Sequence, residues 1–131
     1  MPIEISFTGN KKVDAIINGF TVKTDQSFKS GGDNTAPEPF SLFIASLGTC
    51  AGIYVKSFCD QRGIDTSAIH MVMDYNYDPI QKMITKFIMH IHVPAGFPDQ
   101  YETAVIKTAS LCTVKRHLSD KIENEIIIIR D

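Results

Sequence analysis

Cys50 is one of three cysteines in this 131-residue chain, and cysteine is the residue type that could carry redox chemistry here. It stands in an apolar run with Phe43, Leu47 and Tyr54. A free cysteine in such surroundings is usually a small buried hydrophobe, because apolar burial raises the pKa of a thiol and makes it inert. Taken alone, Cys50 therefore fits a packing role better than a reactive one.

Cys112 stands in different surroundings, near the start of a short predicted helix in the segment SLCTVKRHL. Unsatisfied N–H groups at a helix start favour a thiolate. Lys115 and Arg116 follow three and four residues later, so they share the helix face of Cys112. A reactive thiol and a packing role are equally open for this residue.

The third cysteine and the histidines carry weaker signals. Cys59 falls half a turn from Cys50 on one predicted helix, so the two cannot pair within it, and we assign Cys59 to packing. His90 and His92 fall on one strand face, but no third ligand has a recognisable metal-site spacing. We therefore expect neither a metal nor another cofactor.

A long helix positions Cys50. Pro39 suits the first turn of this helix and Gly63 suits the residue just past its end. The helix is apolar on most sides, which is typical of a buried helix. Its opposite side carries a seam of small residues, namely Ser41, Ala45, Gly48 and Gly52. This seam predicts a second helix close by and hence a homodimer, although packing within one subunit would also use it.

The remaining segments predict an α+β fold, because strands and helices do not alternate as βαβ units. Turns at Gly9-Asn10 and Asn18-Gly19 predict an N-terminal β-meander. A long β-hairpin is expected to turn at Asp78-Pro79. Two helices and a closing strand follow. The expected strands are residues 3–8, 12–17, 20–24, 68–77, 80–93 and 122–129, and the expected later helices are residues 98–110 and 111–118.

Composition narrows the classes of function. The net charge of -2 and the dispersed basic residues argue against binding to nucleic acid. Residues 39–55 are uncharged but short for a membrane span, and the N-terminus lacks the pattern of a secretory signal. We expect one soluble, cytoplasmic domain over residues 1–131, in a compartment where structural disulfides are unlikely to persist.

Two segments resemble the OsmC/Ohr family. GGDNTAPEPFSLFIASLGTC is similar to its polar loop and proline-bearing helix that leads to a cysteine, and SLCTVKRHLSD is similar to its second cysteine at a helix start. The resemblance implies an OsmC-like fold and an intertwined homodimer with the site at the subunit interface. It also implies thiol-dependent reduction of organic hydroperoxides. Cys50 would attack the peroxide, Cys112 would close a disulfide, and a dithiol would reopen it.

The chain departs from the family's dedicated organic hydroperoxide reductases in the groups that activate the first cysteine. It has no arginine before Arg62, and Phe40 or Ser41 stands where a helical glutamate belongs. Glu38, Lys29 and Arg116 are the candidate substitutes, so the chain is closer to the less characterised OsmC-like branches.

Two other functions remain open. One is a binding or carrier protein that holds an apolar or thioester ligand against a wall of Phe43, Leu47 and Tyr54. The other is a structural dimer with inert thiols.

Overall fold

The computed structural model of the protein describes residues 2–118, apart from the side chain of Lys115. The chain divides after Ala45 into two compact units, residues 1–45 and residues 46–131. The predicted closing strand, residues 122–129, lies outside the described residues. The single-domain organisation stays a prediction.

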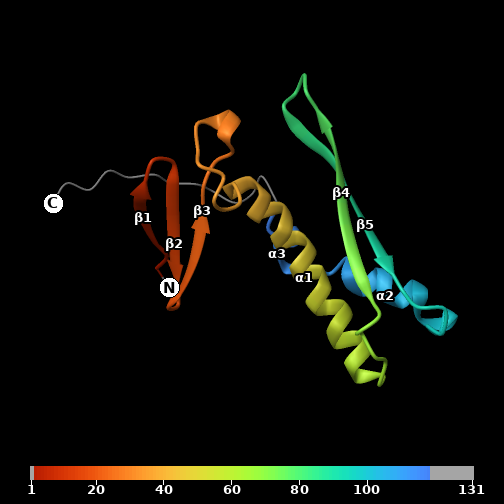
Figure 1. The fold of residues 1–131 in the computed structure, drawn as a ribbon. Helices are drawn as coiled ribbons and strands as arrows, with labels where there is room; N and C mark the ends of the chain where they lie inside the picture. The colour runs from red at the N-terminus through yellow and green to blue at the C-terminus, as the bar shows by residue number, and fades with distance from the viewer. Residues whose placement is uncertain (1, 119–131) are drawn as a thin grey trace. The chain divides into compact units, whose positions relative to one another are not determined.

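The first unit contains the predicted β-meander. Strands β1 (Glu4–Gly9), β2 (Lys12–Ile17) and β3 (Phe20–Thr24) form an antiparallel sheet in the order β1-β2-β3 (Figure 1). Between β2 and β3, Asn18 and Gly19 have φ angles of 50° and 83°. These positive angles are the ones that a tight two-residue hairpin turn requires, and they explain why the sequence predicts this turn.

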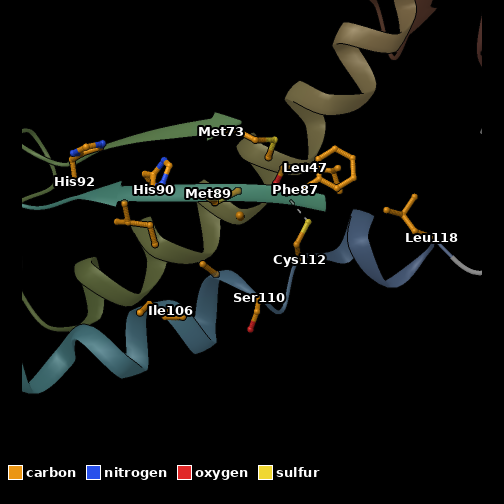
Figure 2. A pocket seen from close by; sticks show the side chains of 13 residues that line it. Leu47, Met73, Phe87, Met89, His90, His92, Ile106, Ser110, Cys112 and Leu118 are labelled. Carbon is orange, nitrogen blue, oxygen red and sulfur yellow. Dashed lines mark hydrogen bonds between the residues drawn. The ribbon is translucent and has the colours of Figure 1, made fainter. Parts of the chain in front are cut away.

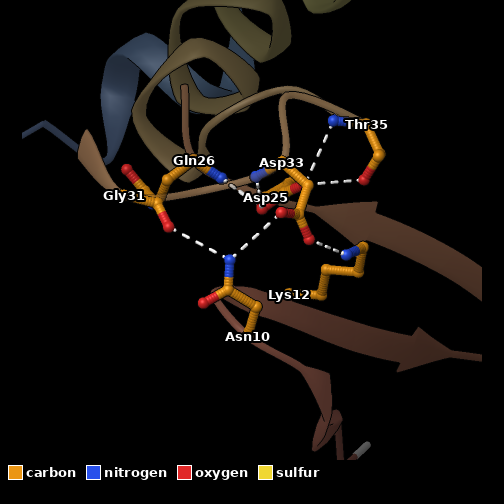
Figure 3. Close-up of polar contacts among 7 residues, drawn as sticks. All are labelled: Asn10, Lys12, Asp25, Gln26, Gly31, Asp33 and Thr35. Atoms are coloured by element: carbon orange, nitrogen blue, oxygen red, sulfur yellow. Dashed lines mark hydrogen bonds and ion pairs between the residues drawn. The ribbon is translucent and has the colours of Figure 1, made fainter. Parts of the chain in front are cut away.

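The polar loop after β3 is organised around the carboxylate of Asp25, which is fully buried (Figure 3). It accepts hydrogen bonds from the backbone N–H of Gln26 and from both the N–H and the hydroxyl of Thr35. The hydroxyl of Thr35 is the largest cause of a strongly lowered pKa at Asp25. The loop is therefore an ordered structure, held by a buried carboxylate that stays ionised.

Helix α1 spans Pro39–Gln61, and Gly63 follows it with a φ of +64°. Both ends agree with the sequence prediction. The face that carries Leu47 also carries Ala51, Val55 and Phe58, and all four side chains are buried.

The second unit adds the predicted hairpin. Strands β4 (His70–Asp78) and β5 (Met83–His92) run antiparallel beside each other (Figure 1). The second strand starts at Met83 rather than at residue 80, because the carboxylate of Asp78 accepts hydrogen bonds from the N–H groups of Ile80 and Gln81. These bonds close the turn and keep Ile80 out of the ladder.

The helices that follow are shorter than the sequence predicts. Instead of one helix over residues 98–110, a 3-10 helix, η2 (Asp99–Tyr101), leads into α2 (Glu102–Ala109). Instead of a helix over residues 111–118, α3 covers only Thr113–Arg116. Cys112 therefore stands just before α3.

The core of the second unit lies where α1, α2 and the hairpin meet. Its buried members are Ala51, Val55, Phe58, Cys59, Phe97, Val105 and Ala109. Met71, Met89 and Ile91 of the hairpin pack against this cluster. These contacts fix the part of α1 that carries Cys50.

The glycines of the small-residue seam have a different neighbour from the one that the sequence predicts. A Cβ atom at Gly48 would lie 3.4 Å from the Cε of Met73, and one at Gly52 would lie 3.8 Å from the Sδ of Met71. Methionines of β4, not a second helix, occupy the space beside these glycines. For Gly48 and Gly52 the predicted helix–helix contact is wrong, and packing within one subunit is correct.

Candidate thiol site

The structure brings Cys50 and Cys112 together from two segments that are distant in sequence. The thiol of Cys112 donates a hydrogen bond of 3.8 Å to the carbonyl oxygen of Leu47, in the turn of α1 that precedes Cys50. Cys112 is only 3% exposed, whereas Cys50 is half-buried. Both thiols are free. This contact holds the segment before α3 against α1.

Cys50 lies in surroundings that stabilise its thiolate. The backbone N–H of Val114 is the largest cause of a lowered pKa at Cys50, and the neighbouring side chain of Cys112 is the next largest cause. The backbone N–H and the side chain of Thr113 lower the pKa further. Partial burial acts in the opposite direction but is outweighed. The sulfur of Cys50 therefore faces the donors at the start of α3.

The sequence assigns these helix-start donors to the wrong cysteine. Because Cys112 precedes α3, the N–H groups of Thr113 and Val114 act on a sulfur from another element, that of Cys50. Burial was expected to make Cys50 inert, whereas its pKa is lowered by contacts that only the tertiary fold supplies. Helical spacing alone contains no signal for this effect.

Two further residues contact the start of α3. The hydroxyl oxygen of Tyr54 lies 3.0 Å from the Oγ1 of Thr113. The guanidinium of Arg116 donates to the same Oγ1 across 3.4 Å. Tyr54 and Arg116 are thus placed beside the donors to Cys50, and sequence reasoning missed Thr113, which links them.

The other predicted site residues have other neighbours. Leu47 is buried and accepts the hydrogen bond from Cys112. Phe43 belongs to the first unit, where its ring stacks on that of Phe40 at 5.7 Å. Glu38 also belongs to the first unit, and its carboxylate accepts a hydrogen bond from the N–H of Ser27. In the structure Glu38 supports the polar loop.

A mostly apolar cavity of about 830 Å³ opens beside Cys112 (Figure 2). Leu47 and Phe87 lie with Cys112 at one end of it, and α2 contributes Ile106. Cys50 does not line this cavity. This cavity therefore leads to the buried thiol, not to the thiol with the lowered pKa.

Cys59 and the histidines do not join the site. Cys59 is fully buried in the core, and its pKa is raised, chiefly by burial and then by the charge of Asp60. This agrees with its assignment to packing. The rings of His70 and His92 stack across the hairpin at 4.4 Å. Within residues 2–118, no three potential ligands are grouped in a way that could hold a metal ion.

A sequence model of the OsmC-like protein family matches residues 31–126, which include both Cys50 and Cys112. The chain belongs to the OsmC-like family. No protein of curated function matches it. The matched residues include the later part of the polar loop, α1, the hairpin and the segment around Cys112, and the match agrees with the resemblance of the two cysteine segments.

Solved structures show the same α+β fold of the OsmC-like family. An osmotic stress and detoxification response protein of Psychrobacter arcticus is 17% identical to this chain, with a TM-score of 0.77. The match covers 90% of this chain and 88% of that protein. An organic hydroperoxide resistance protein OsmC of Legionella pneumophila is 15% identical, with a TM-score of 0.59, over 88% of each chain. At these identities the likeness establishes the fold alone.

A third solved structure holds an organic ligand. It is an organic hydroperoxide resistance protein of Vibrio cholerae with captopril bound in one of its active sites. It is 13% identical, with a TM-score of 0.57, and the match covers 94% of this chain and 88% of that protein.

Helix α1 of this OsmC-like protein is long and apolar enough to cross a membrane, judged by length and composition only. The core helices of soluble proteins meet the same criterion, and OsmC-like proteins are generally soluble.

The lowered pKa of Cys50 predicts unequal reactivity of the three thiols. With iodoacetamide at neutral pH, we expect Cys50 to react about tenfold or more faster than Cys59, because the thiolate is the nucleophile and Cys59 is buried with a raised pKa. The rate at Cys50 should also persist to lower pH than that of an ordinary cysteine. Peptide mass spectrometry over a pH series measures both effects, and slow, equal labelling of all three cysteines would contradict them.

Proposed function

We propose that this OsmC-like protein is a thiol-dependent peroxidase that reduces organic hydroperoxides through Cys50 and Cys112. The observation that carries the proposal is the half-buried Cys50, whose thiolate is stabilised chiefly by the backbone N–H of Val114 and whose neighbour is a second thiol, that of Cys112. A reactive thiol and a second thiol within hydrogen-bonding reach are the two parts that such a reaction needs.

The proposed reaction has three steps. The thiolate of Cys50 attacks the distal oxygen of the hydroperoxide ROOH, so Cys50 becomes a sulfenic acid and the alkoxide leaves and is protonated to the alcohol ROH. The sulfur of Cys112 then displaces the hydroxyl group of the sulfenic acid as water and forms a disulfide. A dithiol reduces the disulfide and is itself oxidised, which restores both thiols.

The different burial of the two cysteines supports this division of roles. Cys112 is only 3% exposed and its thiol is bonded to the carbonyl of Leu47, so Cys50 is the easier of the two for a peroxide to reach. The proposal requires the Cα atoms of Cys50 and Cys112 to lie about 4.4 to 6.8 Å apart when the disulfide forms.

The apolar cavity beside Cys112 supports an organic substrate. Its walls include Leu47, Met73 and Ile106, which would favour an alkyl or aryl group over water. An organic molecule, captopril, also occupies an active site of the Vibrio cholerae relative. Reduction of organic hydroperoxides fits a role in oxidative-stress defence in the cytoplasm.

The apolar surface of the second unit supports a homodimer. Ile53 on α1 is 58% exposed, Ile106 on α2 is 65% exposed, and Leu111 and Leu118 flank α3 with about half of their surface exposed. Proteins of the OsmC-like family are homodimeric, so such side chains would lie against a second chain. We propose that a second copy of the chain covers these side chains and completes the site near Cys50.

The proposal predicts that replacing Cys50 by serine abolishes the reduction of cumene hydroperoxide by a dithiol, because serine cannot form the sulfenic acid. The loss should be at least about a hundredfold in the rate of peroxide consumption. The Cys59→Ser variant is the matched control and should keep the wild-type rate, since Cys59 lies in the core away from the site. Equal rates for wild type and Cys50→Ser would rule the proposal out.

The apolar cavity also favours a second function, a carrier that binds an apolar or acyl thioester ligand. Native mass spectrometry of freshly purified protein distinguishes the two. A bound acyl compound together with no peroxide consumption would favour the carrier, whereas an empty protein that consumes peroxide would favour the peroxidase.

A homodimer predicts about twice the chain mass in light scattering coupled to gel filtration. Replacing Ile106 by aspartate should shift the protein towards the monomer, because a charge would then be buried in the apolar contact. Lys107→Asp, at the next position of α2, is the control and should stay dimeric. A monomeric wild type at micromolar concentration would contradict the proposed assembly.

A further inference from the structure

Thr113 joins the reactive cysteine to two polar side chains. It follows Cys112 and is the first residue of α3. Residues 112 and 113 contact α1 on either side of Cys50, because Cys112 bonds to Leu47, one turn before it, and Thr113 contacts Tyr54, one turn after it. Thr113 therefore lies beside Cys50, and its backbone N–H and hydroxyl both favour the thiolate. The same hydroxyl oxygen lies 3.0 Å from the hydroxyl of Tyr54 and accepts a hydrogen bond from Arg116. Two polar side chains from two helices thus meet at one threonine hydroxyl beside Cys50.

The hydrogen-bonding capacity of the Thr113 hydroxyl determines which of its neighbours donate a hydrogen bond and which accept one. A threonine hydroxyl can donate one hydrogen bond and accept two. Arg116 can only donate, so its bond occupies one lone pair. A thiolate at Cys50 can only accept, so it requires the single proton of Thr113. The bond from Tyr54 must then be donated to the second lone pair, and in this arrangement every group is satisfied.

The opposite arrangement would leave Cys50 without this donor. If Tyr54 accepted from Thr113, the threonine proton would point away from the sulfur. Tyr54 projects from α1 one turn after Cys50, and the core packing of the same helix fixes that turn. The orientation of the threonine proton is therefore set by a residue of the helix that carries the reactive thiol.

We propose that the hydroxyl of Thr113 is a hydrogen-bond donor to the Cys50 thiolate, and that Tyr54 and, more weakly, Arg116 are positioning residues that orient it. These three residues take the place of two groups that the chain lacks, an arginine before Arg62 and a glutamate at position 40 or 41. The role in peroxide reduction rests on the proposed function, whereas the stabilisation of the thiolate does not.

The effect on reactivity has a defined dependence on pH. A hydrogen bond to the thiolate raises its fraction at neutral pH, and the rate of attack follows that fraction. Loss of the donor should therefore slow Cys50 about three- to tenfold near pH 7 and leave the rate almost unchanged at high pH, where the thiol is fully ionised. A damaged site would be slower at every pH.

The test measures the rate at which iodoacetamide modifies Cys50, peptide by peptide, over a pH series. Thr113→Val removes the hydroxyl and keeps the shape, Thr113→Ser keeps the hydroxyl, and Tyr54→Phe removes only the positioning group. Thr103→Val and Tyr77→Phe are the matched controls, since both residues are exposed and lie on α2 and β4. The rate of Cys50 modification plotted against pH has an inflection at the pKa of the thiol. We expect this inflection to move to higher pH in Thr113→Val and less far in Tyr54→Phe. It should not move in Thr113→Ser or in the controls.

Several outcomes would overturn this inference. A Thr113→Val profile that superimposes on the wild type would show that the hydroxyl does not act on Cys50, and a uniform loss of rate at all pH values would indicate a merely structural role. If Thr113→Val fails to fold, an unshifted Tyr54→Phe profile overturns the proposed positioning. A shifted Thr113→Val profile in a protein that consumes no hydroperoxide would support the donor role of Thr113 and refute only the proposed peroxidase activity.

Discussion

The candidate site depends on the contact between the start of α3 and the Cys50 turn of α1. The thiol of Cys112 anchors this contact on the carbonyl of Leu47, and the N–H of Val114 then reaches the sulfur of Cys50. Neither segment provides a reactive thiol by itself. A mid-helix cysteine has no free backbone donors of its own, and a buried cysteine before a short helix has little access to solvent.

The packing of α1 makes that contact possible. Its buried face is held between α2 and the hairpin, and Gly48 and Gly52 beside that face leave room for the methionines of β4. This rigid support leaves the side of Cys50 and Tyr54 free to meet α3. Backbone N–H groups and a threonine hydroxyl are the groups that lower the pKa of Cys50, and neutral donors of this kind stabilise a thiolate without a buried ion pair.

Local chemistry explains how much of this could be predicted from sequence. Pro39 and Gly63 define α1 because their backbone preferences are local, and Asn18-Gly19 define a turn for the same reason. The proximity of the two cysteines came only from the family resemblance. The neighbour of Gly48, the donors to Cys50 and the role of Thr113 could not be predicted, because each is a contact between segments that no periodicity or spacing encodes.

The most direct test is to treat the reduced protein with one equivalent of cumene hydroperoxide and to map the products by mass spectrometry without reduction. If the two thiols act as a pair, the digest will contain the Cys50 and Cys112 peptides joined by a disulfide, with Cys59 still a free thiol. A sulfinic acid at Cys50 beside an unmodified Cys112, or no oxidation of Cys50 at all, would contradict the account.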